Sequence, residues 1–242
     1  MKQILQAALK TVFPDHCLLC GDLTDEMHGL CGPCWRDTPF LLTPGCKLCG
    51  APLLGSDGGD GAICEDCRET MPPWDAGTTV MLYEGAARRL AMAIKHGDRS
   101  DLVSPLAQWM APKARPLVET GMIVVPVPIH WRRLLLRRHN QAAGLARHLA
   151  KELGLPCLPD ALRRCQATSQ QKKMTKAESF AQQSNSIAPT PLWQHQLKGR
   201  AVLLVDDVMT TGATLAACAN ACHAAGARRV CVVTLARAVR TP

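Results

Sequence analysis

The sequence predicts an α/β protein in which helices flank a parallel β-sheet, with a small cysteine-rich module in front of it. Short apolar runs rich in β-branched residues, above all residues 201–205, are typical of strands that are buried on both faces. Eight of the 13 cysteines fall in four CxxC pairs within the first 70 residues. A chain of 242 residues, 47% hydrophobic and 20% charged, has room for one sizeable core and such a module.

The cysteine-rich module opens with an amphipathic segment, residues 1–12, that is too polar and too short for a signal peptide. Without an export signal, metal binding in the cytoplasm is favoured over a disulfide framework. CLLCG and CGPCW are followed 29 residues later by CKLCG and CEDCR, so the module repeats itself. We expect two closed, structural Zn²⁺ ribbons, with cross-braced pairing or an iron–sulfur centre as the alternatives. The predicted ligands are Cys17, Cys20, Cys31 and Cys34 in one site and Cys46, Cys49, Cys64 and Cys67 in the other.

Met71, Pro72 and Pro73 are the expected boundary, so the predicted domains are residues 1–70 and residues 71–242. In the second domain, hydrophobic periodicity predicts helices and buried strands in alternation. The expected strands are residues 78–83, 122–127 and 201–205, and the expected helices are residues 85–96, 101–115, 142–153 and 215–225.

The most specific pattern is AVLLVDDVMTTGAT, residues 201–214. A buried strand is expected to end at Asp206 and Asp207, and a loop rich in Thr and Gly then leads to a helix. Beyond the carboxyl end of a parallel strand, the N-terminus of the next helix favours a bound anion such as phosphate. Carboxylates accept hydrogen bonds from a vicinal diol or coordinate Mg²⁺ bound to one, so the pair and the loop together describe a ribose 5-phosphate. The alternative is a buried strand with a helix cap and an ordinary turn.

The run VLLVDDVMTTGAT resembles the phosphoribosyl pyrophosphate (PRPP) motif of type I phosphoribosyltransferases. The resemblance implies a type I phosphoribosyltransferase-like fold that binds PRPP together with Mg²⁺. It also implies that Asp206 and Asp207 are the catalytic residues and hold the ribose hydroxyls. The residues implied to bind the 5-phosphate are Met209, Thr210, Thr211, Gly212, Ala213 and Thr214.

A second strand exit is a candidate pyrophosphate site, because two prolines fix the loop there and four arginines follow within residues 132–138. A rigid loop with a basic arm suits several negative charges, and a solvated basic helix start is the alternative. Further basic residues lie in a long loop expected over residues 163–176. The predicted pyrophosphate-binding residues are Pro126, Val127, Pro128, Arg132, Arg137, Arg138 and Lys95.

Charge is distributed unevenly, with five Lys/Arg against ten Asp/Glu in residues 1–70 and 23 against ten in the remainder. The second domain is therefore the part in which a polyanion would bind. No apolar run reaches the length of a membrane span.

From residue 9 to residue 237 the chain resembles the ComF (competence protein F, GntX-like) family. The matching stretches are the segment before FPDHCLLCG, the ribbons, LYEGAARRLAMAIKHGDRSDL, VVPVPIHWRRLLLRRHNQAAGLA, RCQATSQQ and VLLVDDVMTTGATL. The family usually has Arg-Gly-Phe-Asn-Gln where this chain has Arg138, His139, Asn140 and Gln141. The resemblance implies a cytoplasmic protein of natural transformation, acting near single-stranded DNA and helicase or recombination partners.

Two functions follow from these observations. One is a PRPP-dependent phosphoribosyltransferase, whose acceptor substrate no pattern identifies. The other is an adaptor associated with nucleic acid, or a PRPP sensor, that keeps the pocket without turnover. The Arg cluster is not interleaved with aromatic residues, as the stacking sites for single strands are.

Overall fold

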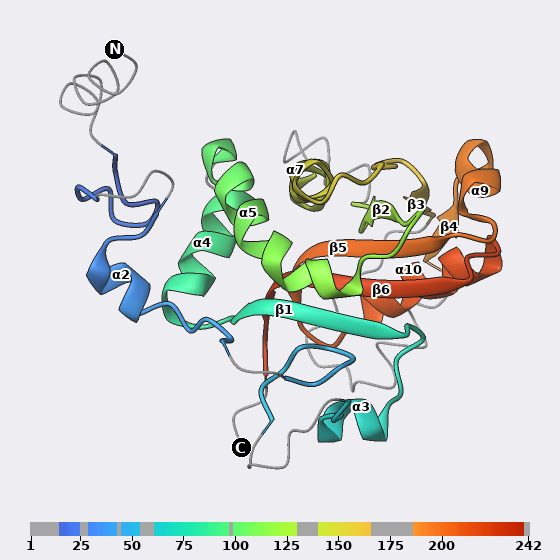
Figure 1. Ribbon diagram of the computed structural model, residues 1–242, viewed down its shortest axis with the longest axis horizontal. Coiled ribbons are helices and arrows are strands. Elements are labelled where there is room, and N and C mark those ends of the chain that lie inside the picture. The colour runs from blue at the N-terminus through green and yellow to red at the C-terminus, as the bar shows by residue number, and fades with distance from the viewer. Residues whose placement is uncertain are drawn as a thin grey trace.

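The computed structural model describes residues 15–24, 29–42, 45–53, 61–96, 99–129, 140–165 and 186–239. Its centre is a parallel four-stranded sheet with the order β1-β6-β5-β2 (Figure 1). The parallel pairing runs from Ala76↔Cys231 between β1 and β6 and from Ile123↔Val202 between β2 and β5. These strands are β1 (Ala76–Leu82), β2 (Ile123–Pro126), β5 (Ala201–Met209) and β6 (Arg229–Arg237).

Alternate residues of the central strands pack into two different apolar layers, as the period of two requires. Leu203 and Val205 belong to the core formed with α4, α5 and α7, whereas Val202 and Leu204 belong to the core formed with α10. In Figure 1, α5 and α7 lie above the sheet and α3 lies below it. The helices are α2 (Gly32–Arg36), α3 (Glu65–Glu69), α4 (Gly85–His96), α5 (Val103–Ala114), α7 (Gln141–Leu153), α9 (Pro191–Leu197) and α10 (Ala213–Ala224), with 3-10 turns η1 (Ser100–Leu102) and η2 (Arg115–Leu117).

The structure confirms the expected fold class and corrects two expected boundaries. The strand expected to end at Val205 continues as β5 to Met209, so both acids lie inside it. The long loop expected from residue 163 begins with a strand, because β3 (Leu162–Arg164) pairs antiparallel with β4 (Ile187–Pro189). Local periodicity could not reveal that pairing, because the partner is more than 20 residues away.

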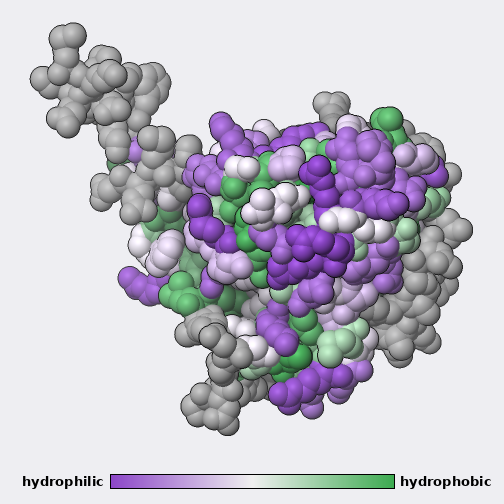
Figure 2. All heavy atoms as spheres, turned by 45° about the vertical axis from the view of Figure 1, so that its right-hand side comes forward, coloured by the Kyte–Doolittle hydropathy of each residue, from purple (hydrophilic) through white to green (hydrophobic). Residues whose placement is uncertain are grey.

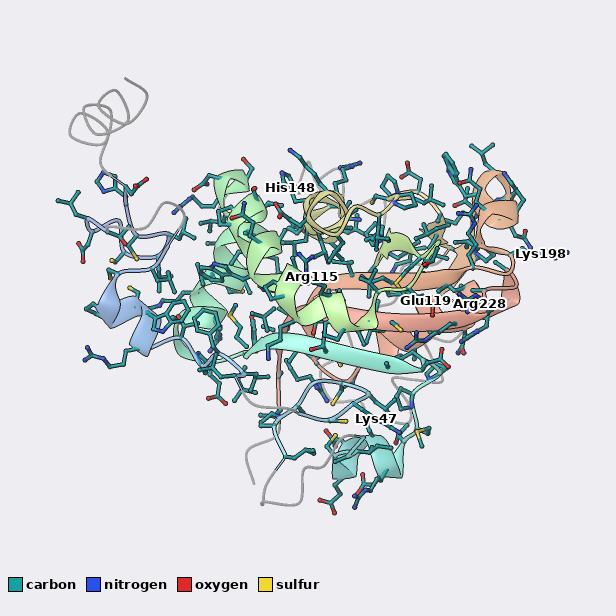
Figure 3. All side chains as sticks on the ribbon, in the orientation of Figure 1. Lys47, Arg115, Glu119, His148, Lys198 and Arg228 are labelled. Carbon is teal, nitrogen blue, oxygen red and sulfur yellow. The ribbon has the colours of Figure 1, made fainter. Side chains whose placement is uncertain are left out.

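Both edges of the sheet are covered, which removes the unpaired backbone that exposed edges present. On the outer side of β1, Gly77 donates to the Lys47 carbonyl at 2.7 Å and Leu41 donates to the Val80 carbonyl at 2.9 Å. Lys47 lies below β1 in Figure 3. On the outer side of β2, the Val124 amide donates to the Pro156 carbonyl at 2.9 Å.

The surface is polar over most of the face seen in Figure 2, with small apolar areas between hydrophilic side chains. Exposed large apolar residues are scattered over several elements, for example Leu23, Trp35 and Leu192. None of the described helices has the length and apolar character needed to cross a membrane.

Candidate functional site

The acid pair occupies the sixth and seventh positions of the nine-residue strand β5, where the strand is leaving the core. Asp206 and Asp207 are both half-buried, in contrast to the fully buried residues 201–205 before them. Each carboxylate accepts the next backbone amide, Asp207 N to Asp206 Oδ1 at 2.9 Å and Val208 N to Asp207 Oδ1 at 2.8 Å. Because an ionised carboxylate has about four acceptor positions, both acids keep capacity for a ligand.

Burial and the neighbouring charge of Asp207 raise the pKa of Asp206 well above its usual range. The positive charge of Lys95, on α4, acts in the opposite direction on that pKa. Lys95 is thus close enough to influence Asp206, although it comes from a helix more than 100 residues earlier. The carboxylate of Asp206 is in an environment that a cation or a hydroxyl donor would make more favourable.

The loop after β5 forms a small hollow at the N-terminus of α10. Gly212 is the N-cap residue, with φ +81°, a conformation that side chains with a Cβ rarely adopt. The Thr211 hydroxyl accepts the Ala213 amide at 3.3 Å, and the Gly212 carbonyl accepts the Ala216 amide at 2.8 Å. The hollow has a volume of about 190 Å³. It is lined by Asp206, Val208, Met209, Thr210, Thr211, Gly212, Ala213, Thr214 and Leu215.

The hollow includes all six loop residues predicted from sequence, and it distinguishes the two acids. Asp206 lines it and Asp207 does not. Adjacent residues of a strand point to opposite faces, so a pair that reads as one unit in the sequence is divided by the pleat. The helix begins at Ala213, two residues earlier than expected, which brings its N-terminus up to the hollow.

The predicted pyrophosphate loop leaves the neighbouring strand at the same edge, since β2 and β5 are parallel. Pro126, Val127 and Pro128 are buried, and the Val127 amide donates to the Val205 carbonyl at 2.9 Å. The Asn140 side chain caps α7 and also donates to the Val127 carbonyl at 3.3 Å. The predicted Arg132, Arg137 and Arg138 lie outside the described residues.

A second, larger hollow of about 620 Å³ lies over α7 and was not anticipated from the sequence. Its lining includes Arg147, Arg163 and Arg164 against one acid, Asp160. Gln141 also lines it and is 5% exposed, and its amide nitrogen has no hydrogen-bond partner among the described residues. His148 lies on α7 in Figure 3. Two signals were present in the sequence, the Asn-Gln pair that opens an alanine-rich helix and the basic residues that begin at Arg163.

The eight CxxC cysteines form two separate groups of four, confirming sequential pairing within each half of the module. Within each group the sulfur atoms lie within 4.8 Å of one another. In the second group, hydrogen bonds from Cys49 and Cys67 lower the pKa of Cys46, while hydrogen bonds with Cys46 and Cys49 raise the pKa of Cys67. Four thiols this close cannot all ionise without a cation between them, so the donor set fits structural zinc.

Two of the cysteines outside these groups are packing residues of the core. Cys218 and Cys222 are fully buried in α10, and burial raises the pKa of each thiol.

Comparison with known proteins finds both modules and relatives of the whole chain. A double zinc ribbon domain model matches residues 8–68, and a phosphoribosyl transferase domain model matches residues 139–241. Competence protein F of Haemophilus influenzae is 26% identical over 232 residues, 93% of this chain and 98% of that protein. The DNA utilization protein YhgH of Escherichia coli K12 is 29% identical over 230 residues, 93% of this chain and 97% of that protein.

Among solved structures, the allosteric regulatory enzyme of purine biosynthesis overlaps with a TM-score of 0.40 at 17% identity, covering 60% of this chain and 30% of that one. A hypoxanthine phosphoribosyltransferase from Staphylococcus aureus overlaps with a TM-score of 0.36 at 10% identity, covering 57% and 64%.

Proposed function

We propose that this chain, a member of the competence protein F family, binds PRPP together with Mg²⁺ and acts as a phosphoribosyltransferase. The observation that carries the proposal is the hollow at the end of β5. It combines a half-buried carboxylate, two exposed threonines and the N-terminus of a 12-residue helix. A phosphate needs the hydrogen-bond donors of the loop and the helix N-terminus, and a diol beside it needs the carboxylate.

In this proposal the loop of residues 209–214 holds the 5-phosphate through backbone amides and threonine hydroxyls. Among the described residues Asp206 is the only acid that lines the hollow, so a dianion meets little repulsion from them. Asp206 and Asp207 hold the ribose hydroxyls, and Mg²⁺, when bound with PRPP, supplies neutralising charge to the leaving pyrophosphate. Lys95 and the loop of residues 126–128 face the pyrophosphate, with Arg132, Arg137 and Arg138 as the basic arm that follows.

Calorimetric titration with PRPP, with and without Mg²⁺, tests the proposal. Wild type should bind only when Mg²⁺ is present, and Asp206→Asn, which changes the carboxylate that lines the hollow, should weaken binding by roughly tenfold to a hundredfold, because hydrogen bonds to charged groups contribute about 1.5–3 kcal/mol. Asp101→Asn is the control, because Asp101 is 57% exposed and is paired with Arg99. Equal affinity in all three proteins, or binding that ignores Mg²⁺, would contradict the proposal.

A second candidate, an adaptor for single-stranded DNA, is supported by the basic hollow over α7. Three arginines lie around it, and the two relatives are named for competence and for DNA utilization. No Phe, Tyr or Trp is among the described residues that line it, so phosphate contacts rather than base stacking would dominate. A cytoplasmic location with helicase or recombination partners belongs to the same proposal.

Pyrophosphate release from PRPP, measured with and without single-stranded DNA, separates the two candidates. Release that Asp206→Asn abolishes supports the transferase. DNA binding that weakens steeply with salt and with Arg147→Gln, without any release, supports the adaptor.

A further inference from the structure

We propose that Arg237 and Trp74 are positioning residues that connect the second cysteine group to the phosphate loop, so that metal in that group keeps the loop in order. The second group is Cys46, Cys49, Cys64 and Cys67, and the phosphate loop is residues 209–214. The effect on ligand affinity rests on the proposed function, whereas the effect on loop order does not.

The guanidinium of Arg237 is hydrogen-bonded to the backbone at the start of the phosphate loop. It is the last residue of β6, it is paired in register with Met209 at the end of β5, and it is only 3% exposed. Its Nη1 donates to the carbonyls of Met209 at 3.3 Å, of Ala238 at 2.9 Å and of Thr210. One guanidinium therefore fixes the two peptide groups at the start of the loop.

The other end of the same guanidinium reaches the second cysteine group. Arg237 Nη2 lies 3.5 Å from Asp66 Oδ2. Asp66 is in α3, between Cys64 and Cys67. Any movement of these two cysteines therefore moves its carboxylate. A buried charge that loses a partner is costly, which makes this contact more consequential than a surface ion pair.

Trp74 makes a second connection of the same kind. Its side chain is 5% exposed, and its Nε1 donates to the carbonyl of Leu48, between Cys46 and Cys49, at 2.6 Å. The edge of its ring faces the loop, because a Cβ added to Gly212 would lie 3.3 Å from Trp74 Cη2. A small cleft is accordingly lined by Cys49, Asp66, Cys67, Trp74, Met209, Thr211, Gly212 and Arg237, among others.

The first cysteine group provides a natural comparison, because an aspartate near it also pairs with an arginine. Asp37 follows α2 and lies 2.7 Å from Arg89, but the two side chains are 54% and 60% exposed. Exposed pairs contribute little, and this one contacts α4 rather than the phosphate loop. Removing the charge of Asp37 changes an aspartate near a cysteine group without touching the loop, whereas removing that of Asp66 does both. Comparing the two variants therefore isolates the effect of the connection to the loop.

Hydrogen exchange of the zinc-loaded full chain without ligand tests the proposal. In Asp66→Asn and Trp74→Phe we expect the amides of residues 209–216 to exchange on the order of tenfold faster, with β1 and the zinc content unchanged. Asp37→Asn should exchange like wild type. The proposal is overturned if zinc is retained and residues 209–216 exchange equally in all four proteins, or if exchange rises equally over the whole sheet.

Ligand affinity is the second measurement, with ribose 5-phosphate as the probe. Asp66→Asn and Trp74→Phe should weaken its binding on the order of tenfold relative to Asp37→Asn. If wild type does not bind the probe or PRPP, the proposed function fails, while the exchange result still decides on the connection. Arg237→Lys keeps the charge and loses the planar fork, so it should loosen the loop as well; if it does not fold, the two milder variants decide.

Discussion

Replacing Gly212 by alanine tests the geometry of the phosphate loop directly. The backbone at Gly212 has φ +81°, in the left-handed region, where a residue with a Cβ pays about 1–2 kcal/mol. The new methyl group would also stand 3.3 Å from the ring of Trp74, which is buried and hydrogen-bonded and so has little freedom to retreat. We expect the free energy of unfolding to fall by about 1–2 kcal/mol from the backbone strain alone, and the contact with Trp74 adds to that loss. A loss of about 1–2 kcal/mol lowers the Tm of a chain of this size by about 2–8 °C.

The matched control is Gly121→Ala, in the turn before β2. Gly121 has φ +77°, but a Cβ there meets no atom within 4 Å, so it pays the backbone penalty alone. Thermal unfolding of both variants, followed by titration with ribose 5-phosphate, separates strain from contact. Gly212→Ala should be the less stable of the two and should bind more weakly, whereas Gly121→Ala should bind like wild type. If the two variants unfold alike and bind alike, the loop is not held as described.

Three further outcomes follow from the described contacts. Asp206 has a raised pKa in the folded state, so between its unfolded pKa of about 4 and that raised pKa the folded protein binds more protons than the unfolded chain. The stability of the wild type should therefore fall as the pH rises through this range, whereas Asp206→Asn should lack the decline. Tm measured against pH checks the sign. A chelator should remove metal from the first cysteine group at least about tenfold faster than from the second, because Cys20 of the first group is exposed and Cys46 of the second is 1% exposed. A metallochromic dye should therefore report metal release in two phases. Thr79→Val should cost about 1–2 kcal/mol in denaturant unfolding, because its hydroxyl bonds the buried Thr234 hydroxyl at 2.8 Å, and adding Thr234→Val should recover part of that loss.

Local pattern was sufficient for the elements whose signals are local. The buried strand before Asp206, the glycine at the start of α10 and the two groups of four cysteines were all visible as short runs with fixed spacing. The β3–β4 pair was missed because its strands are short and distant in sequence. The separate positions of Asp206 and Asp207 were missed because a motif gives order along the chain and not the direction of side chains.

Arg237 could not have been found from its own surroundings in the sequence. It lies in the run VVTLARAV, where a basic residue after an apolar strand indicates an exposed end. Its burial depends on carbonyls from β5 and a carboxylate from α3, which come together only in the fold. Contacts of this kind have no sequence spacing from which to predict them.

The second cysteine group of the cysteine-rich module packs backbone against backbone on β1. A Cβ on Gly77 would lie 2.1 Å from the Leu48 carbonyl, and a Cβ on Gly50 would lie 2.4 Å from the Thr79 amide, so neither glycine can be enlarged without moving backbone. The second cysteine group therefore lies directly on β1 while also reaching the loop after β5 through Arg237. Because β6 lies between these two strands in the sheet, the second cysteine group is in contact with both an edge of the sheet and the carboxyl end of its strands. Metal in the second cysteine group would thus be connected, through Asp66 and Arg237, to the backbone at the start of residues 209–214.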